Sequence, residues 1–202
     1  MPPFARTRML FYFSTMKNIL LLLCLAIVQS SFAQSNIDAT VAIKELKNGA
    51  MVVNLIHPTK KIEALLASGR KEESIALQES VMQDHKDLIN AFTQNYSFSK
   101  LLFVYSTDMG KLADGDASVL FSASGNAQSS LPETIYFVEL AKTEEQSLNG
   151  LVVKDKNRDP LAKPFPYFVS QYAFLRIKKR TYNDMTEELN RRLTDFYRHI
   201  NN

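Results

Sequence analysis

The longest unbroken apolar run of the chain, from Ile19 to Val28, decides where the protein folds and what can hold it together. Its ten residues form a helix of about 15 Å, whereas the hydrocarbon core of a bilayer is about 30 Å thick. Lys17 precedes the run, and Ser31-Phe32-Ala33 follows it with small residues at the two positions that a signal peptidase inspects. This order predicts a cleavable signal peptide over Met16–Ala33 that leaves no permanent membrane span. We therefore expect residues 34–202 to be periplasmic or secreted.

Two further questions concern the leader: where translation starts, and whether the leader carries a lipid anchor. Translation from Met1 or Met9 instead of Met16 lengthens the region before the apolar run and changes nothing after it. A lipoprotein carries its cysteine after small residues at the cleavage point, but Cys24 lies between leucines inside the run. We therefore expect no lipid anchor.

Cleavage also removes the only cysteine, so the mature domain has no disulfide, no thiolate nucleophile and no cysteine-ligated metal. Its core must hold it together, and about 170 residues suffice for that. Three of the 24 basic residues and none of the 21 acidic residues precede residue 34, so the mature domain is neutral. The net charge of +3 belongs to the leader, and we expect no binding of nucleic acid.

Apolar periodicity and turn residues divide residues 34–202 into short elements. The expected helices lie before Asn48-Gly49, between Pro58 and Ser68-Gly69, over residues 71–94, and from Thr181 onward. The expected strands cover residues 50–56, 101–105, 119–123, 134–141 and 151–154, and an extended edge passage covers 161–170.

Two of the expected helices carry apolar stripes. For the helix over 71–94 the predicted packed stripe comprises Ile75, Met82 and Ile89, seven residues apart, with Val81, Leu88 and Phe92 beside them. For the last helix it comprises Tyr182, Met185, Leu189, Leu193, Phe196 and Ile200. Thr181 and Asp184 have the spacing of a capping box at the start of that helix.

The element order predicts a single α/β (α+β) domain over 34–202, with a mixed β-sheet of about five strands and helices packed against it. The helices between the strands at 50–56 and 101–105 favour a crossover that makes these strands parallel. Leu131–Phe137 resembles the proline and buried strand of the thioredoxin-like fold, in which a hairpin and a terminal helix also follow. The CxxC centre of that fold is absent, so thiol–disulfide chemistry is not implied. The tracts KNGAMVV, LLFVYSTD and KPFPYFV are similar to uncharacterised exported bacterial proteins of unknown function.

His57 is the residue most suggestive of chemistry. It ends the first predicted strand and Thr59 follows it where a helix begins, and ligands bind at the carboxyl ends of strands and at helix N-termini. Ser106 and Asp108 end the next strand. In parallel neighbouring strands, His57 and Asp108 share one edge of the sheet as a candidate catalytic base and its orienting carboxylate. The alternative is ordinary turn chemistry, because both residues lie in segments typical of turns.

An aromatic tract is the second candidate site. Phe165, Tyr167 and Phe168, near Tyr172 and Phe174, either cover the core or display an apolar patch for a partner. The adjacent cluster of Lys178, Lys179 and Arg180 suits anionic lipid or a polyanion, although such a cluster before a helix is typical of a solvated connection.

No metal or other cofactor is expected. His57, His85 and His199 are scattered, and His85 lies on the apolar edge of a helix. The cluster of Asp108, Asp114 and Asp116 lacks the Asp/Asn pattern and the closing glutamate of a calcium loop. Asp155, Asn157 and Asp159 are followed by Pro160 where such a loop needs its glycine, so a polar turn is preferred there. Nothing selects a nucleophile among Ser129, Ser130 and Ser170.

These observations favour a binding or interaction protein, with a cell-envelope protein as one possible partner. The main alternative is a small hydrolase-like or divergent thioredoxin-like enzyme that uses His57 and Asp108. A third alternative is a lipid or polyanion binder that uses the basic cluster at residues 178–180.

Overall fold

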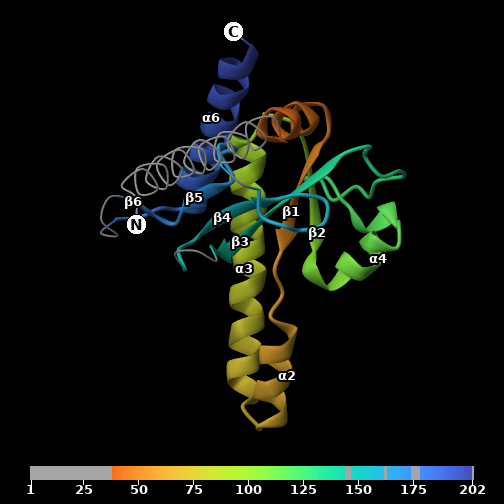
Figure 1. Ribbon diagram of the computed structural model, residues 1–202. Helices are drawn as coiled ribbons and strands as arrows, with labels where there is room; N and C mark the ends of the chain where they lie inside the picture. The colour runs from red at the N-terminus through yellow and green to blue at the C-terminus, as the bar shows by residue number, and fades with distance from the viewer. Residues whose placement is uncertain (1–37, 144–146, 162, 174–177, 202) are drawn as a thin grey trace, which may run out of the picture.

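A mixed five-stranded β-sheet forms the centre of the protein, in the strand order β2-β1-β3-β4-β5 (Figure 1). The computed structural model describes residues 38–143, 147–161, 163–173 and 178–201, so the predicted signal peptide lies outside the described residues. The strands are β1 (Ala50–Leu55), β2 (Lys100–Tyr105), β3 (Ile135–Lys142), β4 (Asn149–Lys154) and β5 (Phe168–Ser170). β1 is parallel to both β2 and β3, whereas β4 is antiparallel to both of its neighbours. The predicted mixed sheet and the predicted parallel pair are confirmed.

Alternate side chains of β1 enter two separate cores, which explains why this strand is apolar throughout. Met51, Val53 and Leu55 face the larger core. Three helical segments contribute to this core: residues 38–48, α3 (Lys71–Asn95) and α6 (Tyr182–Asn201). Val52 faces the smaller core, which Leu112 and Leu120 cover from the connection after β2. That connection contains η1 (Ser106–Asp108), α4 (Met109–Ala113) and η2 (Ala117–Val119).

The last helix begins and packs as its sequence predicts. The backbone N–H of Thr181 donates to the Asp184 carboxylate at 2.9 Å, and the N–H of Asp184 donates to the Thr181 hydroxyl at 3.2 Å. This is the reciprocal capping box. Met185, Leu189 and Leu193 are fully buried in the larger core.

Two helices form an arm that projects away from the sheet (Figure 1). It consists of α2 (Thr59–Ala67) and the first half of α3, joined by a turn in which Gly69 has a φ of 75°. The predicted packed stripe of α3 is wrong along this arm, because Ile75 is 47% exposed and Met82 is 60% exposed. Val81, Leu88 and Phe92 are buried as predicted, and the buried face also contains Ser74, His85 and Ala91. Ile75 and Met82 lie beyond the sheet, on a side of α3 that the described part of the chain leaves exposed.

The predicted strand over 119–123 is also wrong. Asp116 accepts the backbone N–H of Ser118 at 2.9 Å and caps η2, so the chain turns at the point where a strand was expected. Phe121 alone pairs with the sheet, through two backbone hydrogen bonds to Phe103. A turn at Gly125 then leads the chain away.

The edge passage over 161–170 becomes a strand only at β5, and the Lys163–Pro164 bond that precedes it is cis. A two-stranded sheet of β6 (Tyr172–Ala173) and β7 (Lys178–Lys179) connects β5 to α6. None of the helices within the described ranges is both long enough and apolar enough to cross a bilayer.

Candidate functional site

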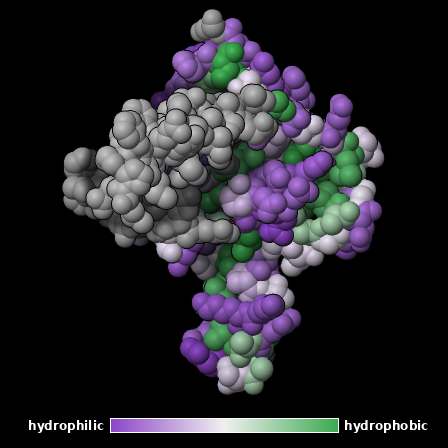
Figure 2. Space-filling view, viewed as in Figure 1, coloured by the Kyte–Doolittle hydropathy of each residue, from purple (hydrophilic) through white to green (hydrophobic). Residues whose placement is uncertain are grey.

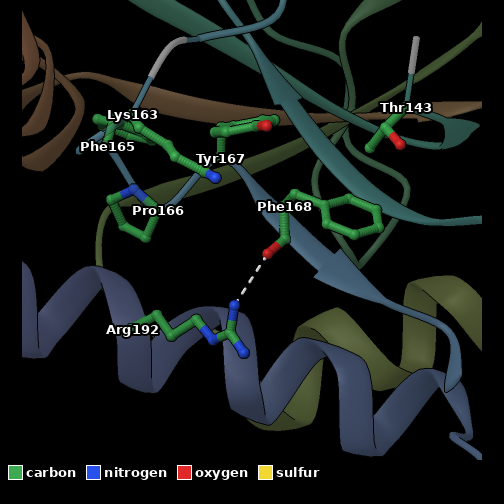
Figure 3. Close-up of a pocket in the computed structure, with 7 residues that line it drawn as sticks. All are labelled: Thr143, Lys163, Phe165, Pro166, Tyr167, Phe168 and Arg192. Carbon is green, nitrogen blue, oxygen red and sulfur yellow. Dashed lines mark hydrogen bonds between the residues drawn. The ribbon is translucent and has the colours of Figure 1, made fainter. Parts of the chain in front are cut away.

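A pocket opens between the segment that leads into β5 and the middle of α6 (Figure 3). Its volume is about 270 Å³, at the small end of the range for ligand pockets. It is lined by Thr143, Lys163, Phe165, Pro166, Tyr167, Phe168 and Arg192. The three aromatic residues predicted as a patch or as core cover therefore meet in one place, and we refer to this place as the aromatic pocket.

The aromatic residues differ in exposure: Phe165 covers the core, whereas Tyr167 and Phe168 are accessible from the pocket. Phe165 is 2% exposed and belongs to the larger core, where its ring stacks on Tyr136 at a centroid distance of 6.5 Å and meets Phe196 edge-on at 6.3 Å. Tyr167 and Phe168 are half-buried and show part of their rings to the pocket. Phe165 thus anchors the segment, and the two following aromatic residues form an accessible apolar wall.

Arg192 is the polar group with the best-defined position in the aromatic pocket. Its Nε donates to Glu188 at 2.6 Å, and Nη1 donates to the backbone carbonyl of Phe168 at 3.0 Å (Figure 3). Of the five N–H groups of a guanidinium, these bonds use two, and no other hydrogen bond joins Arg192 to the described residues. Its side chain is 40% exposed and lines the pocket, so the guanidinium keeps N–H groups that can donate to a bound molecule.

Lys163 gives the aromatic pocket a second positive charge. Its side chain extends toward the ring of Tyr167 (Figure 3). It forms no ion pair with any residue in the ranges that the structure describes. Glu144 and Glu145 follow Thr143 in the sequence and lie outside the described residues.

Glu188 keeps its negative charge next to Arg192. Burial acts to raise the pKa of Glu188, but hydrogen bonds from Arg192 and Arg191 outweigh burial and hold this pKa below its ordinary value. The ionised carboxylate fixes the guanidinium in place and neutralises part of its charge. The aromatic pocket therefore presents an oriented donor, a second cation and two aromatic rings, which is a combination suited to binding.

The carboxyl ends of β1 and β2 lie together, as expected. The backbone N–H of His57 donates to the Ser106 hydroxyl at 2.8 Å. Nδ1 of His57 lies 3.0 Å from the Thr59 hydroxyl oxygen. The Asp108 carboxylate accepts a hydrogen bond from Lys111 at 2.8 Å. Each side chain of the proposed catalytic pair thus has a local partner, and no hydrogen bond between His57 and Asp108 is present within the described residues. A catalytic role for the pair stays a prediction.

A buried charged cluster escaped the sequence interpretation. Glu139 accepts hydrogen bonds from Asn54 at 2.6 Å and from Lys154 at 2.7 Å, and Arg158 lies 3.4 Å away. Burial acts to raise the pKa of Glu139, but these partners outweigh it and lower the pKa below its ordinary value. The sequence could have indicated this cluster, since Asn54 and Glu139 each lie inside an otherwise apolar buried strand. A buried polar group requires a hydrogen-bond partner, so two such residues are expected to meet. The cluster ties β1, β3 and β4 together, and we interpret it as structural.

Two of the remaining candidates, Asp155 and Arg180, have local structural partners. Asp155 accepts the backbone N–H groups of Asn157 and Asp159, both at 2.9 Å, which makes this segment a polar turn. Arg180 donates to the backbone carbonyl of Ser170 at 3.0 Å, whereas Lys178 and Lys179 are exposed on β7. Phe174 lies outside the described residues. Within the described ranges, no three His, Asp or Glu side chains gather as a metal site would require.

No family model matches the chain, and no similar curated protein or solved structure was found. The resemblances to the thioredoxin-like fold and to uncharacterised exported proteins stay predictions.

Proposed function

We propose that the protein is an exported binding protein of the periplasm or cell exterior. Its aromatic pocket takes an anionic group, such as a carboxylate or phosphate, that is joined to an aromatic or apolar moiety. One observation carries this proposal: Arg192 is held by Glu188 and by the backbone carbonyl of Phe168, and its guanidinium lines the same pocket as the accessible aromatic rings.

The held guanidinium favours an anion. Guanidinium N–H groups form strong charge-assisted hydrogen bonds with carboxylate and phosphate oxygens. A side chain that is already oriented in the free protein loses little conformational entropy when the ligand binds, so more of the interaction energy becomes affinity. Lys163 adds attraction for an anion without imposing a geometry.

The rings favour an aromatic or apolar moiety next to the anion. Tyr167 and Phe168 are half-buried, so a ligand that covers them removes apolar surface from water. The volume of about 270 Å³ accommodates a small group and not a large cofactor. The natural ligand is therefore a small molecule of this kind, or one side chain or terminus of a partner protein in the cell envelope.

The enzyme alternative has weaker support, because His57 and Asp108 each bond to a different neighbour. The polyanion alternative also has weaker support, because one of its three cations, Arg180, bonds to the backbone within the chain.

Calorimetric titration with three probes tests the proposal: phenyl phosphate, inorganic phosphate and phenol. We expect phenyl phosphate to bind more tightly than either of the other two, and Arg192→Gln to weaken its binding by roughly ten-fold, the value of one charge-assisted hydrogen bond. Arg191→Gln is the matched control, because Arg191 pairs with the same Glu188 and does not line the pocket. Absence of phenyl phosphate binding, or equal losses in the two variants, would contradict the proposal.

A further inference from the structure

An apolar stripe of α3 lies uncovered along the arm. Ile75 and Met82 are both exposed, and Ile89 follows at the same spacing, partly buried against the larger core. Residues seven apart lie two turns apart on one side of a helix, so these three side chains form a continuous line. Figure 2 shows apolar side chains on the surface of the arm among mostly polar ones. We refer to this line as the α3 stripe.

The other sides of α3 are occupied by the chain itself. α2 packs on the side that buries Ser74 and Val81. α6 contacts a further side, where Tyr182 donates to Asp84 at 3.1 Å and Asn95 donates to Asn183 at 3.1 Å. Met82 follows Val81 by one residue, or about 100° around the helix, so it points away from α2.

Two charges flank the α3 stripe in a self-complementary way. Glu79 follows Ile75 by four residues, and Lys86 follows Met82 by four residues, so both lie along the same side of the stripe. Neither forms an ion pair with a residue in the described part of the chain. When a second α3 runs antiparallel with Met82 facing Met82, Ile75 lies opposite Ile89 and Glu79 lies opposite Lys86. In a parallel pair the two copies instead place Glu79 and Lys86 on opposite flanks of the contact, so no Glu79–Lys86 pair forms.

Met82 also lies near the middle of α3, which extends from Lys71 to Asn95. Antiparallel helices centred on Met82 therefore overlap along nearly their whole length, and the two sheets lie at opposite ends of the pair. In this arrangement the end of one copy's arm approaches Thr93 of the other copy, and Thr93 is exposed.

We propose that two copies of this chain associate through the α3 stripe, as an antiparallel, two-fold symmetric pair centred on Met82. The contact is isologous, so each copy uses the same surface and the assembly closes at two. The dimer buries the exposed apolar side chains of the arm and forms two Glu79–Lys86 pairs between the copies. It is independent of the aromatic pocket.

Cysteine cross-linking tests the register, because Cys24 is the only natural cysteine. In a Cys24→Ser background, we expect Met82→Cys to give a disulfide-linked dimer under mild oxidation. A disulfide requires the two Cβ atoms to lie about 4 Å apart, which only a residue at the two-fold axis meets with its own copy. Ile75→Cys and Ile89→Cys should each form no disulfide-linked dimer alone and should cross-link when they are mixed. Ser80→Cys, exposed on another side of α3, is the matched control.

Charge reversal tests the same arrangement at equilibrium. We expect sedimentation equilibrium of the unmodified protein to show a monomer–dimer equilibrium. Glu79→Lys or Lys86→Glu alone should weaken the dimer by roughly ten-fold, because two attractive pairs become repulsive. The double variant should return to within about three-fold of the original, since the pairs are then reversed and not lost. Far-ultraviolet circular dichroism confirms that each variant remains folded.

Several results would overturn the proposal. If the protein stays monomeric up to about 1 mM, the proposed dimer does not form, because a dissociation constant above about 1 mM does not correspond to specific association. Cross-linking of Ile75→Cys with itself indicates a parallel pair, and equal cross-linking of Ser80→Cys indicates random collision. A monomer whose α3 stripe is covered by a different protein also contradicts self-association.

Discussion

Replacing Lys154 with methionine should destabilise the domain strongly, because it leaves the Glu139 carboxylate buried without its nearest cation. The Glu139 side chain is 7% exposed and Lys154 is 18% exposed, so solvent screens their 2.7 Å ion pair only weakly. Met keeps most of the Lys stem, so the change removes the ammonium and little packing. Breaking a buried ion pair costs about 3–5 kcal/mol. Since Asn54 and the more exposed Arg158 still reach Glu139, we expect about 2–4 kcal/mol at neutral pH.

The pH dependence of the stability difference shows whether the charge of Glu139 causes it. In the native protein the pKa of Glu139 is lowered, so its contribution to stability is present above the unfolded-state pKa and is lost as pH falls through the folded-state pKa. Without Lys154 the desolvation of the carboxylate persists and its main counter-charge is gone, so the pKa rises. The difference in stability between the two proteins should therefore be large at pH 7 and should shrink as Glu139 becomes protonated in both.

Thermal and urea unfolding of both proteins, at neutral and acidic pH, measure this difference. For a domain of this size, about 2–4 kcal/mol lowers Tm by roughly 6–12 °C. Lys156→Met is the matched control, because Lys156 is exposed in the turn next to Lys154 and should change Tm by less than about 2 °C. A cost for Lys154→Met below about 0.5 kcal/mol, or one that is the same at both pH values, would refute the reasoning.

Three further predictions concern other parts of the molecule. Gly150→Ala should lower the free energy of unfolding by about 2 kcal/mol or more, as urea unfolding will show, because the added Cβ would lie 2.1 Å from the Val169 carbonyl oxygen. Thr181→Ala should cost about 1 kcal/mol in the same assay by removing the hydroxyl that caps the Asp184 N–H. The intact mass of the protein from its native cell envelope should correspond to a chain that begins at Gln34, and a mass that includes Met16–Ala33 would contradict cleavage.

Much of the fold was predictable because its signals are local. The apolar runs of β1 and β2 gave two buried strands, and the helices between them required the parallel pairing that the structure contains. The capping box of α6 was visible as a spacing of three residues. By contrast, the residues around Phe121 look like a strand, but only one residue pairs, because the turns on both sides depend on Asp116 and Gly125.

The candidate site was predictable only in part. The aromatic tract identified Phe165, Tyr167 and Phe168. Arg192 was not predicted, because it lies 24 residues after Phe168, whose carbonyl it binds. It lies on α6, for which the sequence predicted only the apolar stripe. Which side of α3 is covered also depends on tertiary structure. Ile75 and Met82 satisfy helical periodicity, but the sheet does not extend far enough to meet them.

The interior position of β1, between β2 and β3, affects how the protein folds. Both neighbours of β1 are made after it, and the Asn54–Glu139 contact between β1 and β3 joins residues 85 apart in the sequence. Such long-range parallel pairing is slow to form. The emerging polypeptide therefore has no complete sheet until most of it has been synthesised, and the proposed export would require the chain to cross the membrane before that point.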